Sequence, residues 1–170
     1  PQLEGLPDNV LPIIAYSLSK TFTLYGTRCG AMICMAKTKA IADEFKRVCE
    51  FSARGTWSNS TKLAQVILSM IYSEPALLKK VNEERAVYRE MLLKRGKAFS
   101  AEAAKVDLNM VPFDAGFFIS IPCDNSDQVS KRLEKENVFL VPLAKGLRVS
   151  IASISEEKCR QLPEMIKNAL

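Results

Sequence analysis

The chain is organised around residues 17–30, which read Ser17-Leu18-Ser19-Lys20-Thr21-Phe22-Thr23-Leu24-Tyr25-Gly26-Thr27-Arg28-Cys29-Gly30. A short apolar run with strand propensity precedes this stretch at residues 11–16, and a second follows it at residues 31–36. We expect the two runs to form buried antiparallel strands. Lys20 then lies where the first strand ends and a loop begins, and Arg28 lies where the next strand starts. Both cations therefore return to the same end of a sheet.

This pairing of side chains has a chemical meaning. The amine of Lys20 can form an imine with an aldehyde, while Ser17, Ser19 and Arg28 can hold an anionic group nearby. A guanidinium makes paired hydrogen bonds to phosphate oxygens, and serine hydroxyls add neutral donors. The alternative is a Ser/Thr-rich turn with two solvated cations, which is the commoner meaning of an isolated S-x-S-K.

The full pattern, S-x-S-K followed by Tyr-Gly and then R-x-G, resembles the lysine segment of fold-type I pyridoxal-phosphate (PLP) aminotransferases of class I/II, the aspartate and aromatic type. The resemblance implies that Lys20 is the catalytic lysine and carries PLP as an imine. It implies that Ser17 and Arg28 bind the cofactor phosphate, with Ser19 as an additional contact. It also implies ping-pong transfer of an amino group between an amino acid and a 2-oxo acid, in which Lys20 acts as base and then acid. For Tyr25, lining the cofactor pocket and simple packing both remain open.

A second arginine interrupts an apolar run near the C-terminus. Arg148 lies within Gly146-Leu147-Arg148-Val149-Ser150, and an unpaired buried charge is costly, so an arginine there needs a partner. The segment resembles the aminotransferase motif whose arginine binds the substrate α-carboxylate. The alternative is an edge-strand position that points to water.

Two further residues match positions near the substrate in the same family. Arg54 lies three residues before Trp57-Ser58-Asn59; in the aspartate and aromatic branch, this arrangement lets the arginine reach the neighbouring subunit's site and pair with a second substrate carboxylate. That favours aspartate or aromatic substrates and a homodimer. The following Ser60-Thr61 departs from the prolines typical of aspartate enzymes, and an arginine placed to stabilise a helix C-terminus is the alternative.

Phe118 matches an aromatic residue that lies near the substrate in the same family. The alternative is that Phe118 is a core residue.

The composition argues against a nucleic-acid-binding, a metal-binding and a membrane protein. The 170 residues are 48% hydrophobic and 25% charged with a net charge of +5, but the cations are dispersed, so we expect no nucleic-acid partner. Binding of a phosphate cofactor and of carboxylate substrates would account for the excess of positive charge. With no histidine and no C-x-x-C pair among five cysteines, we expect no metal site. No membrane-length apolar run is visible, so we expect no membrane partner and a cytoplasmic, reducing location.

We predict an α/β fold that forms the C-terminal part of the PLP-transferase (aspartate aminotransferase-like) fold. Residues 1–75 are expected to belong to the PLP-binding large domain, 76–105 to a long interdomain helix in which Gly96 is a candidate site for a bend, and 106–170 to a small α+β domain. Besides the hairpin and this helix, the expected helices cover 39–53, 60–73, 127–137 and a final segment capped by Ser155. The expected strands of the small domain cover 110–113, 116–122, 138–143 and 147–154.

Related aminotransferases are considerably longer, and their lysine segment lies well inside the chain. We therefore expect this chain to be the C-terminal portion of a longer protein, inactive and poor at binding PLP by itself, with apolar sheet surface exposed. Two other functions stay open. One is a non-catalytic aminotransferase-like regulatory or assembly module, and the other is a PLP lyase or decarboxylase on the same fold.

Overall fold

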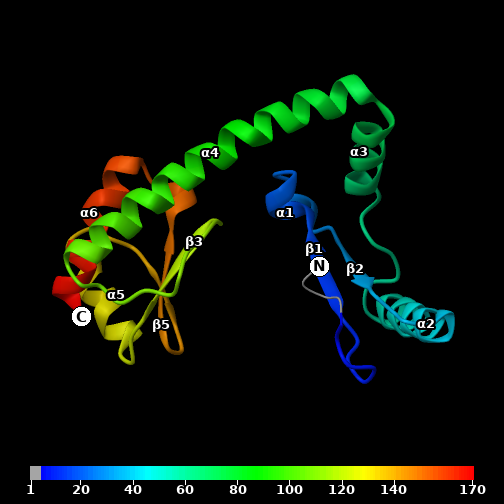
Figure 1. Cartoon of the computed structure of the whole chain (residues 1–170), viewed down its shortest axis with the longest axis horizontal. Coiled ribbons are helices and arrows are strands. Elements are labelled where there is room, and N and C mark those ends of the chain that lie inside the picture. Colours follow the sequence, from blue (N-terminus) through cyan, green and yellow to red (C-terminus); the bar gives the residue numbers. More distant parts are fainter. Residues whose placement is uncertain (1–4) are drawn as a thin grey trace. The chain divides into compact units, whose positions relative to one another are not determined.

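A computed structural model describes residues 5–170 of the chain. The chain divides into two compact units, the first reaching Asn82 and the second covering Glu83–Leu170. The long helix α4 (Pro75–Lys105) begins in the first unit and ends in the second (Figure 1). This helix starts one residue before the predicted range and ends where predicted, as Pro75 at the first helical position favours.

The first unit begins with a β-hairpin. Strands β1 (Ile13–Ser17) and β2 (Gly30–Cys34) pair antiparallel, with Ser17 opposite Gly30 at one end and Ile13 opposite Cys34 at the other. The short helix α1 (Leu18–Thr21) and the 3-10 turn η1 (Tyr25–Thr27) fill the connection. The predicted antiparallel pairing is confirmed, but the predicted burial of the two strands is wrong. A two-stranded sheet leaves both faces open, and the exposed large side chains of its strands are Ile13, Ile14, Met32 and Ile33.

Gly30 explains why the R-x-G part of the motif ends in glycine. A Cβ placed at Gly30 would lie 2.4 Å from the carbonyl oxygen of Tyr16. No real Cβ sits that close to a backbone oxygen, so only glycine lets β2 approach β1 at this point. The register that pairs Ser17 with Gly30 therefore depends on the missing side chain.

Two helices follow the hairpin in the first unit. Helix α2 (Lys39–Thr56) begins at Thr38, whose hydroxyl accepts a hydrogen bond from the Ile41 amide at 3.4 Å, and it runs three residues beyond the predicted end. Helix α3 (Lys62–Ser73) lies within the predicted range. A small core forms where α1 and its connection meet α3; its buried members are Leu18, Phe22, Ala64 and Ile71.

The second unit is a three-stranded antiparallel sheet covered on one face by helices (Figure 1). Its strands lie in the order β3 (Phe118–Pro122), β5 (Gly146–Ser150), β4 (Val141–Leu143). The core side chains of the sheet pack against the end of α4, helix α5 (Ser126–Glu134) and helix α6 (Glu156–Ala169). The antiparallel sheet with helices on one face is as predicted, and so is the cap of α6, since the Ser155 hydroxyl accepts from the Lys158 amide at 3.2 Å.

Two predicted strand segments of this unit are wrong. Residues 110–113 form no strand, and the Val111 amide alone reaches the sheet by donating to the Ser120 carbonyl at 2.9 Å. The predicted strand 147–154 stops at Ser150, because Ile151–Ser153 forms a 3-10 turn, η2. The guanidinium of Arg95 accounts for this break, since it donates to the carbonyls of Ile151 at 3.2 Å and Ala152 at 3.0 Å in place of a neighbouring strand.

Gly96 serves close packing, and α4 continues through it. Gly96 is buried, and a Cβ on it would lie 2.1 Å from the edge of the Phe113 ring. The aromatic ring lies directly against the helix backbone at this glycine, so packing accounts for Gly96, and the bend stays a prediction. Gly55 in α2 offers the opposite case, because nothing lies within 4 Å of a Cβ built there.

The two glycines give a matched prediction. Gly96→Ala should lower the free energy of unfolding by about 1–3 kcal/mol, because the Phe113 ring must leave its place. Gly55→Ala should raise it by about 0.5 kcal/mol, since alanine favours the helix and meets no neighbour. Urea denaturation followed by far-UV circular dichroism measures both. A neutral Gly96→Ala would show that the ring has room to move.

Within residues 5–170, we find no helix long and apolar enough to cross a membrane.

Candidate active site

The loop that carries Lys20 is held in place by two buried side chains. Leu18 and Phe22 flank it and pack into the small core of the first unit, and the Phe22 ring meets Tyr72 edge-on at 6.2 Å. Ser17 caps α1, since its hydroxyl accepts a hydrogen bond from the Ser19 amide at 3.2 Å. Lys20 therefore lies in a short helix, where a loop was predicted, and its side chain is exposed.

The hairpin brings Lys20 and Arg28 to one aromatic ring. The Lys20 Nζ lies 4.6 Å from the centroid of the Tyr25 ring, and the Arg28 Cζ lies 5.4 Å from the same centroid. Arg28 also donates from Nη1 to the Tyr25 carbonyl at 3.1 Å. Ser17 is the last residue of β1, so the candidate amine, guanidinium and hydroxyl gather at one end of the hairpin.

Arg28 adopts a backbone conformation that is unusual for its residue type. Its φ is 52° and its ψ is 46°, in the left-handed region, where it ends the η1 turn. A residue with a Cβ is disfavoured there, by about 1 kcal/mol or more. Glycine would relieve this cost but would remove the guanidinium. Arginine in this position is therefore an observation that points to a functional requirement for its side chain.

In the second unit, the structure brings Arg148 and Phe118 together. Arg148 lies on β5 between Ser120 of β3 and Val141 of β4, on the sheet face opposite the helices. Its guanidinium carbon lies 4.7 Å from the centre of the Phe118 ring. Phe118 is 39% exposed, so it is no core residue.

The Arg148 side chain has an unused hydrogen-bond donor. Arg148 is half-buried, and its Nε is a buried side-chain nitrogen that has no hydrogen-bond partner within residues 5–170. An unsatisfied donor of this kind costs about 1–3 kcal/mol. A guanidinium that lies over an aromatic ring and has an unpaired Nε can take a carboxylate in paired hydrogen bonds.

Arg54 caps the end of its helix in this structure. Its Nη1 donates to the Ser58 carbonyl at 3.3 Å, one turn further along. Ser58 has a φ of 66°, and its amide donates to the Ala53 carbonyl at 3.1 Å, which closes the C-terminus of α2. Helices α1 and α2 lie apart in Figure 1, so Arg54 and Lys20 are carried by separate parts of the first unit.

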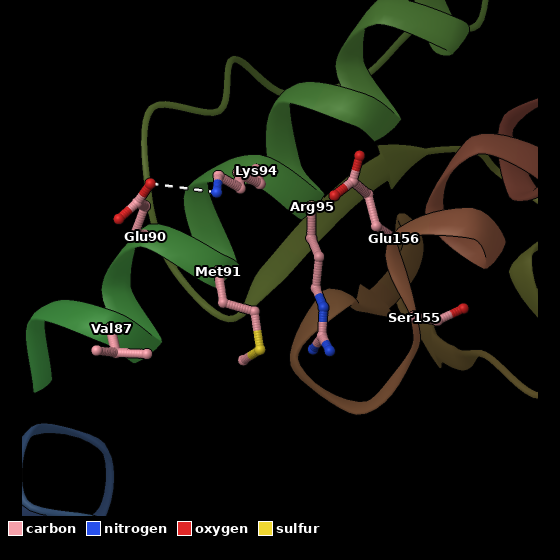
Figure 2. Close-up of a pocket in the computed structure, with 7 residues that line it drawn as sticks. All are labelled: Val87, Glu90, Met91, Lys94, Arg95, Ser155 and Glu156. Atoms are coloured by element: carbon pink, nitrogen blue, oxygen red, sulfur yellow. Dashed lines mark ion pairs between the residues drawn. The ribbon is translucent and has the colours of Figure 1, made fainter. Parts of the chain in front are cut away.

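A shallow hollow in the second unit lies beside α4 and the start of α6. It has a volume of about 370 Å³, and Figure 2 shows the seven residues that line it, among them Arg95, Ser155 and an ion pair of 3.2 Å between Lys94 and Glu90. None of the predicted site residues lines this hollow. Arg95 points away from α4, and its hydrogen bonds to the Ile151 and Ala152 carbonyls support η2, the turn that follows β5. Sequence reasoning missed this arginine, because its partners are carbonyls more than 50 residues away.

Shifted pKa values in the described part of the chain occur at two thiols of the second unit. Burial raises the pKa of the Cys159 thiol above its usual 9.0; nearby Arg95 opposes this and nearby Glu156 adds to it. Burial also raises the pKa of the Cys123 thiol, with a contribution from Asp124 and a smaller opposing hydrogen bond to the Asn125 backbone. Both thiols stay neutral at physiological pH, so neither is prepared as a nucleophile.

Comparison with known proteins places this geometry in a family. The family described as "Aminotransferase class I and II" matches residues 3–166, nearly the whole chain. This chain belongs to the family of class I and II aminotransferases. The family depends on PLP in general, and among the proteins this aminotransferase chain resembles is an aspartate aminotransferase of Pseudomonas aeruginosa, 24% identical over 165 residues. That match covers 92% of the chain and 39% of the relative.

Solved structures agree on the fold. An aminotransferase from Anaerococcus prevotii is 38% identical to this aminotransferase, with a TM-score of 0.88 over 98% of this chain and 41% of that one. An aromatic-amino-acid aminotransferase from Burkholderia pseudomallei, covalently bound to pyridoxal phosphate, is 20% identical with a TM-score of 0.60 over 93% of this chain and 40% of that one. The predicted partial PLP-transferase fold is confirmed. The chain spans about two fifths of the length of these relatives.

The thiol of Cys159 makes the stability of the second unit depend on alkaline pH. Its pKa is raised in the folded state, so the unfolded thiol, with a pKa near 9.0, loses its proton first as the pH rises. The stability it contributes is complete below pH 9 and declines above it, towards the folded pKa. Cys159→Ala should therefore lose less stability between pH 8 and pH 10.5 than the wild type does.

The measurement is the urea midpoint at both pH values, compared as a difference within each variant, so that the packing lost with the sulfur cancels. Cys49→Ala in α2 is the control and should keep the wild-type pH dependence. Equal declines in wild type and Cys159→Ala would contradict a raised pKa at this thiol.

Proposed function

We propose that this chain is part of a PLP-dependent aminotransferase that transfers an amino group between an amino acid, of the aspartate or aromatic type, and a 2-oxo acid. One observation carries the proposal. The hairpin gathers an amine at Lys20, a guanidinium at Arg28 and a hydroxyl at Ser17 at one end, with both cations within 5.4 Å of one ring centroid. An amine for an aldehyde and a guanidinium for a phosphate are the donor set that PLP requires, so these residues fit the cofactor.

Each residue of this end has a distinct role. Lys20 would hold PLP covalently through its Nζ. Arg28 would hold the phosphate with paired hydrogen bonds, and its left-handed backbone supports a requirement for that side chain. Ser17 and Ser19 would add neutral donors from the start of α1. The small core around Leu18 and Phe22 would keep this end rigid while the cofactor is bound.

PLP, when bound, supplies the electron sink that weakens the bonds at the substrate Cα. The Lys20 amine takes the proton from that Cα as a general base and later returns a proton as a general acid. Arg148 binds the substrate α-carboxylate through its guanidinium, whose Nε has no protein partner. The Phe118 ring lies against the carbon of the same guanidinium. These two residues therefore fix how the substrate lies.

The remaining proposals concern organisation and specificity. We assign residues 1–75 to the PLP-binding large domain, 76–105 to the interdomain helix and 106–170 to the small domain. Arg54 would serve a second copy's substrate site in a homodimer, and the exposed apolar side chains of α2 support such an interface. A cytoplasmic location is supported by five cysteines that are all free thiols.

The proposal predicts one covalent link. Full-length protein mixed with PLP should show the absorbance band of covalently bound cofactor, and Lys20→Ala should abolish it, because Lys20 is the amine that shares the Tyr25 ring with Arg28. Lys39→Ala is the matched control, since Lys39 is an exposed lysine of the same unit that pairs with Asp43. Absorbance spectroscopy and intact mass after borohydride reduction measure the link.

A band that survives in Lys20→Ala would refute the role of this residue. Absence of the band in wild-type protein would favour the non-catalytic regulatory or assembly module. A panel of amino acids, assayed with 2-oxo acids, then separates reactions. Release of carbon dioxide or of an eliminated side-chain group, without transfer of nitrogen, would favour a lyase or decarboxylase.

Arg148 gives a second prediction for the reaction. Arg148→Lys should reduce kcat/KM by about 10- to 100-fold, because a lysine cannot make the paired hydrogen bonds to a carboxylate. The loss should be the same for all substrates, since all carry the α-carboxylate. Arg160→Lys on α6 is the control and should leave kcat/KM unchanged, because Arg160 pairs with Glu156.

Arg54→Ala adds a test of substrate class in the same assay. If Arg54 binds a second carboxylate, the loss should fall on dicarboxylic substrates and spare aromatic ones. If it only caps α2, both kinds of substrate should be affected equally or not at all.

A further inference from the structure

Tyr25 is an aromatic residue whose surroundings do not match those of a packing residue. Its side chain is 63% exposed, and it is absent from the small core formed by Leu18, Phe22 and their neighbours. Packing alone therefore does not explain a large ring at this place. The ring instead contacts two cationic side chains, since Lys20 and Arg28 both lie over it.

The contacts to the two cations come from different parts of the loop. Lys20 approaches from α1, with its Nζ 4.6 Å from the ring centroid. Arg28 approaches from the far end of η1, with its Cζ at 5.4 Å, and its Nη1 holds the Tyr25 carbonyl at 3.1 Å. The ring of Tyr25 thus contacts the side chains of both Lys20 and Arg28, and its backbone carbonyl also binds Arg28.

Local structure holds the backbone turn that carries this ring. The Thr27 hydroxyl donates to the Leu24 carbonyl at 2.7 Å and closes the turn on which Tyr25 lies. Leu24 is half-buried against the small core, so the turn is anchored at its start. The positive φ of Arg28 then reverses the chain into β2. The backbone that carries the ring is therefore held at both ends of the turn.

We propose that Tyr25 is a positioning residue that aligns the Lys20 amine and the Arg28 guanidinium for one phosphorylated aldehyde. The inference rests on the proposed function, because it concerns the same cofactor. Without the ring, two like charges on long side chains would separate and sample many rotamers. An aromatic face attracts each cation by an amount that corresponds to about a two- to fivefold change in an equilibrium constant at an exposed site. The attraction comes from the ring, so the hydroxyl is dispensable.

The test compares Tyr25→Leu with Tyr25→Phe in the full-length protein. Tyr25→Leu should weaken PLP binding by about five- to tenfold, since both cations lose the ring, while Tyr25→Phe should stay within about twofold of wild type. Tyr88→Leu removes an exposed tyrosine of α4 and should have no effect. Affinity is measured by titrating cofactor-free protein with PLP and following absorbance.

A second measurement needs no cofactor. In protein labelled with carbon-13 lysine and freed of PLP, the ε-methylene protons of Lys20 should show an aromatic ring-current shift. The shift should persist in Tyr25→Phe and vanish in Tyr25→Leu, and the resonance is assigned by its loss in Lys20→Ala. A merely structural role for Tyr25 predicts instead equal losses of stability and PLP affinity in both variants.

The outcomes separate the two proposals. If wild-type protein binds PLP through Lys20 and Tyr25→Leu binds it equally well, the positioning role is wrong and the proposed function stands. If Tyr25→Phe fails as Tyr25→Leu does, the ring is not the cause and the inference is also overturned. If wild-type protein forms no covalent link, the proposed function fails, and the presence or absence of the Lys20 ring-current shift alone decides whether Tyr25 aligns the amine.

Discussion

The close approach of β2 to β1 at Gly30 is the contact on which the candidate active site depends. Because Gly30 has no Cβ, its backbone can lie against the Tyr16 carbonyl and pair with Ser17. That register sets the length of the connection between the strands, and the connection carries Lys20 at one end and Arg28 at the other. Leu18 and Phe22 then hold the connection against α3 by burial. A shift of the register would change the length of this connection and with it the separation of Arg28 and Lys20.

In the second unit, the decisive feature is the position of one cation, Arg148, on the β-sheet. Alternation along β5 sends Leu147 and Val149 into the core beneath the helices, so Arg148 must lie on the other face. There the Phe118 ring covers the guanidinium carbon, and Nε is left buried without a partner. An arrangement that costs free energy in the unliganded state becomes more favourable when a ligand completes it. The same reasoning applies to Arg28, whose backbone conformation suits glycine better.

Predictions from the sequence succeeded where local chemistry is strong. The apolar periodicity gave the three helices of residues 39–105, and Ser155 marked the start of α6. The predictions failed where contacts between residues far apart in the sequence determine the local structure. Residues 110–113 are rich in strand-forming side chains, yet only the Val111 amide reaches a strand partner. The strand expected to continue past Ser150 is interrupted, because Arg95 binds the carbonyls of η2. The contact of Gly96 with the Phe113 ring was not visible in the sequence either, because the two residues meet only in the folded chain.

By itself, the sequence determined the family, the order of helices and strands, and the candidate residues Lys20, Ser17, Ser19, Arg28, Arg54, Phe118 and Arg148. These depend on spacing and on side-chain chemistry, both of which are local properties of the chain. Only the tertiary structure decided that Tyr25 lies beneath two cations, that Phe118 covers Arg148, and that the Nε of Arg148 lacks a partner. Contacts of this kind depend on which rotamers and which backbone turns the folded chain selects. Residues far apart in the sequence make that selection together.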